Sequence, residues 1–183
     1  MKALCIAAGL ALAGMAPAPL APALAADPVK GNAGTWQVEP PGEGSEETYV
    51  YATSHGRFLA GPQGSGIWVV YGPRKPRSDG SCTFDSCIIN VTLNGSPGYE
   101  QEWVKFAFSD GTSVTARPDM RSGQYNVIND YARVLWPEVA KIMTGLRSAH
   151  WVDVSFSDGN MRRFPLKGSS AALKRGAAAA GAE

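Results

Sequence analysis

The sequence has few of the residues from which active sites are most often built. Its 183 residues include two histidines, His55 and His150, and three cysteines. Neither histidine has a serine, a cysteine or an acidic residue at a recognised motif spacing, so a nucleophile activated by a base is not indicated. Metal-ligand spacings and cofactor-binding motifs are missing as well. We therefore predict no catalytic residue, no metal site and no cofactor.

Net charge and long apolar runs are also scarce. The chain has 17 basic and 16 acidic residues. A chain so close to neutral has no electrostatic reason to bind nucleic acid. The apolar run from Leu4 to Met15 is shorter than the roughly 20 residues that a membrane-spanning helix needs. We expect neither a nucleic-acid partner nor a transmembrane segment in the mature chain.

The same apolar run has the features of a secretory signal. Lys2 supplies a short basic start, and Ala23-Leu24-Ala25 is a cleavage site with small outer residues. We predict that residues 1–25 are a signal peptide and that the mature protein is periplasmic or secreted. Residues 26–173 are predicted to form a single β-rich domain. Residues 174–183, KRGAAAAGAE, are predicted to be a disordered tail.

Glycine and proline are abundant, with 21 and 13 residues, and they separate short apolar segments. This spacing is typical of a β-rich fold with many turns. The predicted early strands are Thr35–Glu39, Thr48–Thr53, Arg57–Ala60 and Ile67–Tyr71. The predicted fold class is mainly β, an antiparallel β-sandwich or barrel-like domain with one short helix packed on it.

Two later segments repeat one hairpin pattern, with turns at Ser109–Gly111 and Ser157–Gly159. A three-residue loop with its glycine in the left-handed region keeps the apolar residues of both strands on one face, whereas a two-residue loop would not. The predicted register pairs Phe106 with Val114 and Val152 with Phe164. On the outer face it places Asp153 opposite Arg163, as an exposed ion pair.

A helix is predicted between these hairpins. Apolar residues recur there at steps of three and four. Pro137 suits the first helical turn, and Gly145 is predicted to end the helix. The stripe consists of Leu135, Val139, Ile142, Met143 and Leu146. A helix of about ten residues is marginal alone, so we expect it to pack on the sheet.

Two cysteines remain after removal of the signal, since Cys5 lies within it. In an exported protein, Cys82 and Cys87 are predicted to form a structural disulfide. A zinc site would need more ligands, and a redox site would favour Cys-x-x-Cys. Cys87 has the strand parity of Ile89 and Val91, so we expect the bridge to face the core.

The densest basic cluster lies just before this pair, in the segment PRKPR. Prolines hold Arg74, Lys75 and Arg77 in an extended segment, where the cations are accessible to an acidic partner. These three residues are the candidate binding residues. The alternative interpretation is an ordinary solubilising loop, because three charges on a neutral protein exert little long-range attraction.

Several residues resemble a known family in type and order. They are the Cys82 and Cys87 pair, Met143, Gly145, Leu166, Gly168, Ala172 and Leu173. In these positions the chain is similar to the invasion-associated locus B family of exported bacterial envelope proteins. The resemblance implies an envelope-associated β-sandwich-like domain with a role in host-cell interaction or envelope stress. It transfers no catalytic residue, and Ser169 stands where members often have an aromatic residue.

Together these observations predict an exported, non-enzymatic β-domain that binds a protein or an envelope component. One alternative is a small secreted inhibitor of a protease or lysozyme, acting through the rigid loop that ends at Cys82. Another is a hydrolase with an unrecognised site, for which His55 and His150 are the available bases.

Overall fold

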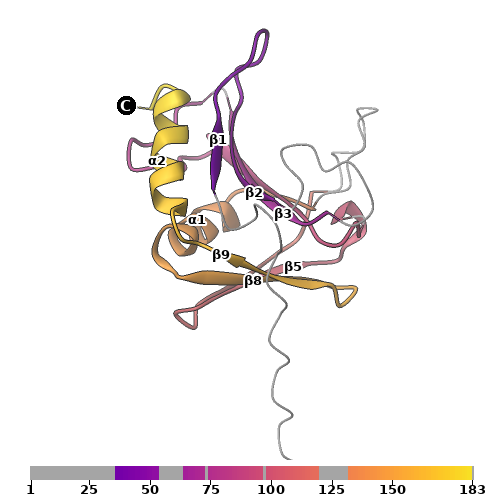
Figure 1. The fold of residues 1–183 in the computed structure, drawn as a ribbon. Coiled ribbons are helices and arrows are strands. Elements are labelled where there is room, and N and C mark those ends of the chain that lie inside the picture. The colour runs from indigo at the N-terminus through magenta and orange to yellow at the C-terminus, as the bar shows by residue number, and fades with distance from the viewer. Residues whose placement is uncertain (1–35, 54–63, 73, 97, 120–131, 183) are drawn as a thin grey trace, which may run out of the picture.

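The computed structural model describes residues 36–53, 64–72, 74–96, 98–119 and 132–182. Two antiparallel sheets of five and four strands face each other (Figure 1). Of the two predicted architectures, the sandwich is therefore confirmed. The predicted signal peptide, the predicted strand at 57–60 and His55 lie outside the described residues.

Both sheets have a simple strand order. The five-stranded sheet contains, in spatial order, β1 (Gln37–Glu39), β2 (Thr48–Thr53), β3 (Gly66–Tyr71), β4 (Cys87–Thr92) and β7 (Ala132–Val134). The four-stranded sheet contains β6 (Ser113–Ala116), β5 (Val104–Phe108), β8 (Trp151–Phe156) and β9 (Met161–Pro165). A short 3-10 helix, η2 (Gly98–Glu100), precedes β5.

The core fills the space between the sheets because alternate residues of each strand point inward. Val50, Ile67 and Ile89 face inward from the five-stranded sheet, and all three are fully buried. Phe106 and Phe156 belong to the same core cluster from the four-stranded sheet. The described strands of both sheets thus share one core, as expected of a single domain.

The predicted hairpin register is confirmed in both hairpins. Phe106 pairs with Val114, and Val152 pairs with Phe164. Gly111 has φ of 86° and Gly159 has φ of 90°, the left-handed conformation that the three-residue loop requires. The repeated turn chemistry therefore aligns the apolar faces of these strands with the core.

The predicted pair on the outer face is confirmed as well. Asp153 lies opposite Arg163 in the register. The Nε and Nη2 atoms of Arg163 each donate to a carboxylate oxygen of Asp153 at 2.7 Å. The guanidinium also lies 3.7 Å from the ring centroid of Trp151. This ion pair is bidentate and its guanidinium stacks on an indole ring, so its geometry is better defined than that of most surface ion pairs.

The first helix, α1 (Glu138–Ser148), packs against β4, β6 and β8. Its predicted buried stripe is confirmed apart from Leu135, which lies before the helix and is 37% exposed. The prediction that Gly145 ends the helix is wrong, because the helix continues to Ser148. Gly145 is instead a contact point, since a Cβ there would lie 2.4 Å from the Phe108 ring.

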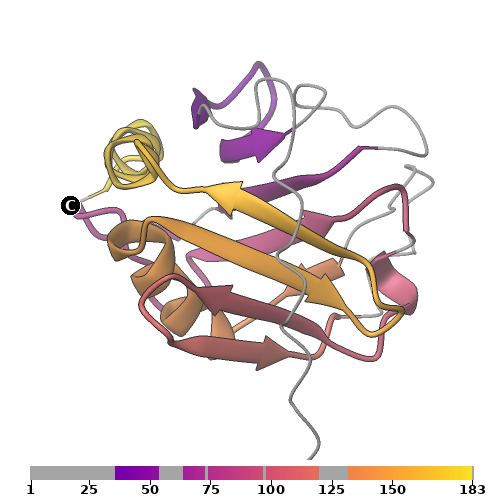
Figure 2. The ribbon, with the colours of Figure 1, turned by 60° about the horizontal axis from the view of Figure 1, so that its bottom comes forward.

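The second helix, α2 (Ser169–Ala179), corrects the prediction of a disordered tail, because residues 174–179 are helical. The physical reason is close packing, since Gly176 and Ala177 are buried. A Cβ at Gly176 would lie 2.1 Å from Cγ2 of Val50. The helix packs against β1, β2 and β3, and both helices lie on the same side of the sandwich (Figure 2).

Candidate binding surface

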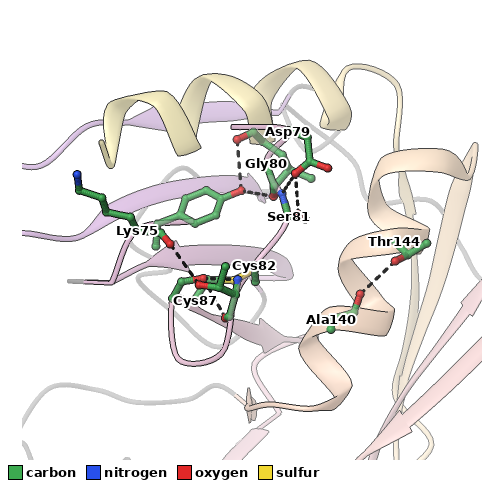
Figure 3. The surroundings of a disulfide bond; sticks show 12 residues. Lys75, Asp79, Gly80, Ser81, Cys82, Cys87, Ala140 and Thr144 are labelled. Atoms are coloured by element: carbon green, nitrogen blue, oxygen red, sulfur yellow. Dashed lines mark hydrogen bonds between the residues drawn. A yellow bond between two sulfur atoms is a disulfide. The ribbon is translucent and has the colours of Figure 1, made fainter. Parts of the chain in front are cut away.

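The loop between β3 and β4 folds back on itself like a small hairpin. Gly72 N–H donates to the Ser86 carbonyl at 3.0 Å, and Arg77 N–H donates to the Ser81 carbonyl at 3.0 Å. Between these bonds, the Thr83 hydroxyl donates to the Lys75 carbonyl at 3.2 Å (Figure 3). Residues 74–77 therefore run beside residues 81–84. The basic segment is held against the cysteine-containing segment along its length.

The predicted disulfide joins Cys82 to Cys87, the first residue of β4, with Cα atoms 5.8 Å apart (Figure 3). Both cysteines belong to the core cluster, with exposed fractions of 7% and 6%, so the predicted inward orientation is confirmed. Closing so short a loop restricts the unfolded chain and stabilises the fold by roughly 2 kcal/mol. The bridge closes residues 82–87 into a six-residue loop.

A second anchor ties the loop to the core and to α2. The Tyr71 hydroxyl, on β3, donates to the Gly80 carbonyl at 2.8 Å and lies 3.3 Å from the Leu173 carbonyl. Burial is the main cause that raises the pKa of Tyr71, so this hydroxyl remains a neutral donor. Gly80 has φ of 84°, and a Cβ there would lie 2.8 Å from the Leu173 carbonyl carbon.

A third anchor lies at the turn itself. The Ser81 hydroxyl and the Ser81 backbone N–H both donate to Oδ1 of Asp79, at 2.6 and 2.8 Å. These two hydrogen bonds are the main reason that the pKa of Asp79 is lowered to about 2. Arg147, near the end of α1, donates to the same carboxylate at 2.9 Å. Because the Asp79 side chain is 49% exposed, this ion pair positions the turn more than it stabilises the protein.

Large apolar side chains are exposed in this loop and in the segment that follows β7. Among the described residues, Phe84 is 59% exposed, and Leu135 and Trp136 are each 37% exposed. No other large apolar side chain in the described ranges is exposed to this degree. The rings of Phe84 and Trp136 meet edge to face with centroids 6.1 Å apart. In the part of the chain that the structure describes, the exposed large apolar residues are thus Phe84, its ring partner Trp136 and the adjacent Leu135, and such grouping is typical of an interaction site.

The predicted binding residues adjoin these apolar groups. Arg74, Lys75 and Arg77 are all exposed, and the Lys75 backbone is hydrogen-bonded beside Phe84 at Thr83. We call the six residues of this surface the aromatic–basic patch: Arg74, Lys75, Arg77, Phe84, Leu135 and Trp136. The sequence predicted the three cations of the patch but not its three apolar residues. An aromatic residue inside a six-residue disulfide loop was the signal available for Phe84.

A second apolar cluster differs from the patch in its burial. It lies on the outer face of the five-stranded sheet, where Tyr51, Trp68 and Val70 are 7%, 8% and 3% exposed. Tyr49 and Ile88 pack against it. Its rings do not offer the accessible apolar area that Phe84 and Trp136 offer, so we assign it a packing role.

The remaining sequence candidates do not form a site in the described part of the chain. His150 lies between α1 and β8, is exposed, and its backbone N–H donates to the Ser109 hydroxyl at 2.8 Å. In the described ranges, no three His, Cys, Asp or Glu residues gather as metal ligands. Neither described helix has the length and apolar character required to cross a bilayer.

Comparison with known proteins found no match among family models, curated proteins or solved structures.

Proposed function

We propose that the protein is an exported, non-enzymatic β-sandwich domain that binds a protein or an envelope component through the aromatic–basic patch. One observation carries this proposal: the exposed large apolar side chains of the described residues gather at a loop anchored on three sides. A loop already held in place loses little conformational entropy when a partner binds, so more of the contact energy becomes affinity.

The composition of the patch supports the same conclusion. Tryptophan, other aromatic residues and arginine are enriched where binding energy concentrates in protein interfaces. The patch combines Phe84 and Trp136 with Arg74 and Arg77, and the hydrogen bond from Thr83 to the Lys75 carbonyl links the basic segment to the residue before Phe84. An apolar centre with a charged margin is the usual arrangement of such an interface.

The proposed location rests on two further features. The predicted signal peptide at residues 1–25 directs export, and a disulfide between Cys82 and Cys87 persists in an oxidising compartment. We propose the periplasm or the cell exterior of a bacterium as the place of action. The resemblance to the invasion-associated locus B family supports a role in host-cell interaction and stays a prediction.

Capture experiments with matched variants test this function. The immobilised protein is exposed to periplasmic and host-cell extracts, and captured proteins are identified by mass spectrometry. Replacing Arg74, Lys75 and Arg77 by alanine should remove specific partners. The control replaces three exposed cations elsewhere, Lys105, Arg117 and Lys167, and should retain them. Identical capture by both triple variants would exclude the basic loop as the binding site.

The rigidity of the loop also favours the second candidate function, an inhibitor of a protease or lysozyme. Inhibitors of this kind insert a preorganised exposed loop into the enzyme, and residues 74–84 are such a loop. The protein should then slow lysozyme or a trypsin-like protease, and Phe84→Ser should relieve the inhibition. Full enzyme activity in the presence of excess protein would rule this candidate out.

A further inference from the structure

We infer that the aromatic–basic patch takes a segment of a partner protein in which carboxylates flank an apolar side chain. This inference rests on the proposed function and specifies the chemistry of the partner. The apolar side chain would lie against Phe84 and Trp136, and the carboxylates would meet Arg74 and Arg77.

The apolar part of the segment follows from exposed area. Phe84 and Trp136 meet edge to face, with Phe84 59% and Trp136 37% exposed. Trp136 follows β7, which pairs with β4 at the Cys87 end of the loop, so both rings stand on anchored backbone. A leucine-sized or aromatic side chain covering both rings would remove apolar surface from water, at about 25 cal/mol per Å² buried.

The acidic part follows from the cations. Arg74 and Arg77 are exposed, and neither has an ion-pair partner among the described residues. Guanidinium groups match carboxylates with two parallel hydrogen bonds. The bond from Thr83 to Lys75 places the basic segment directly beside Phe84, so one short segment can reach both. Charge complementarity therefore specifies acidic residues next to the apolar one.

A protein partner fits this surface better than an anionic bilayer. Asp85 is exposed beside Phe84, and Asp79 is half exposed in the same loop. Insertion of Phe84 into a bilayer would bring the Asp85 carboxylate against anionic headgroups. On a protein partner, whose charges vary from residue to residue, each carboxylate can be accommodated separately.

The experiment selects binding sequences from a random displayed peptide library on the intact, oxidised protein. We expect enriched peptides to place Asp or Glu beside Leu, Ile, Phe or Trp. Their affinity, measured by calorimetry, should fall at least about tenfold in Arg74→Gln/Arg77→Gln and in Phe84→Ser. The control Lys105→Gln/Arg117→Gln should bind like the wild type. Thermal unfolding checks that all variants remain folded.

Three other outcomes would overturn the inference in distinguishable ways. Peptides without acidic residues that still need Phe84 would refute the acidic chemistry and leave the proposed binding surface intact. Binding to vesicles of phosphatidylglycerol and phosphatidylcholine, with no peptide enrichment, would replace the protein partner by a lipid surface. Peptides whose affinity is the same for every patch variant would refute both the inference and the proposed function.

Discussion

Gly80 is the residue on which the position of the loop depends most. Its φ of 84° is one that side-chain-bearing residues rarely adopt, and its Cα faces the backbone of α2 at Leu173. Its carbonyl accepts the hydrogen bond from Tyr71. Glycine is needed at position 80 for two reasons: the backbone is left-handed there, and it approaches a helix closely.

Alanine substitutions at three glycines separate these two requirements. Gly80→Ala should lower the free energy of unfolding by about 2–3 kcal/mol, because left-handed strain and overpacking add. At Gly111 φ is 86°, but nothing lies within 4 Å of the place that a Cβ would occupy. Gly111→Ala should therefore lower the free energy of unfolding through backbone strain alone, by about 1–2 kcal/mol. Gly72→Ala has neither problem and should be nearly neutral. Urea unfolding measures all three, and equal effects at Gly80 and Gly111 would contradict the contact with α2.

At the scale of elements, features specified locally were predictable and long-range ones were not. The register of both hairpins follows from a three-residue turn and strand alternation, which the sequence displays directly. The ordered end of α2 depends on Val50, far away in the chain, and its Ala- and Gly-rich sequence resembles a disordered tail. Leu135 matched the helical period but lies outside the helix, so periodicity alone missed an exposed residue of the patch.

The ion pair between β8 and β9 should be measurable as a coupling energy. A double-mutant cycle with Asp153→Ala and Arg163→Ala should give a coupling of about 1 kcal/mol, the upper end for partly exposed pairs. Both bonds of the pair are 2.7 Å, and Trp151 holds the guanidinium in place. The coupling should weaken as salt concentration rises. A coupling of zero at low salt would mean that the pair adds no stability.

The packing of α2 makes a separate prediction. Gly176→Ala should lower the free energy of unfolding by about 1–3 kcal/mol, because its Cβ would overlap Val50. Adding Val50→Ala should recover part of that loss by making room, which urea unfolding of the single and double variants would detect as a favourable coupling. If residues 174–183 were a disordered tail, Gly176→Ala would leave the free energy of unfolding unchanged.

At the scale of the whole molecule, a polar junction ties the β8–β9 turn to the segment before β5. Asp158 accepts hydrogen bonds from Ser96, from the Gln101 amide at 3.1 Å and from Asn160. Burial of Asp158 favours protonation, but the hydrogen bonds outweigh it and lower the pKa of this carboxyl. The charged form of Asp158 therefore stabilises the fold.

This junction predicts how stability depends on pH. Because the folded-state pKa of Asp158 lies below the ordinary value of 3.8, its contribution is present above that value and is lost as pH falls through the folded-state pKa. The same sign holds for Asp79, whose pKa is about 2. Urea unfolding from pH 5 downward should show decreasing stability, with a smaller decrease in Asp158→Asn. Equal decreases in both proteins would contradict a lowered Asp158 pKa.

The molecule as a whole presents the loop from a rigid scaffold. The disulfide links the loop to β4, Tyr71 links it to β3 and α2, and Arg147 links it to α1. Elements from across the chain therefore converge beneath one small surface. That convergence is why we propose the aromatic–basic patch as the binding surface and a supporting role for the rest of the sandwich.

Photo-crosslinking from the patch tests this assignment most directly. Benzoylphenylalanine replaces Phe84 in one protein and the exposed Thr115, on β6, in another. In living cells or host extracts, we predict a discrete crosslinked species at position 84 that disappears when Trp136 is changed to Ser, and none at position 115. Crosslinking to the same species at position 115, or none at position 84, would contradict the assignment.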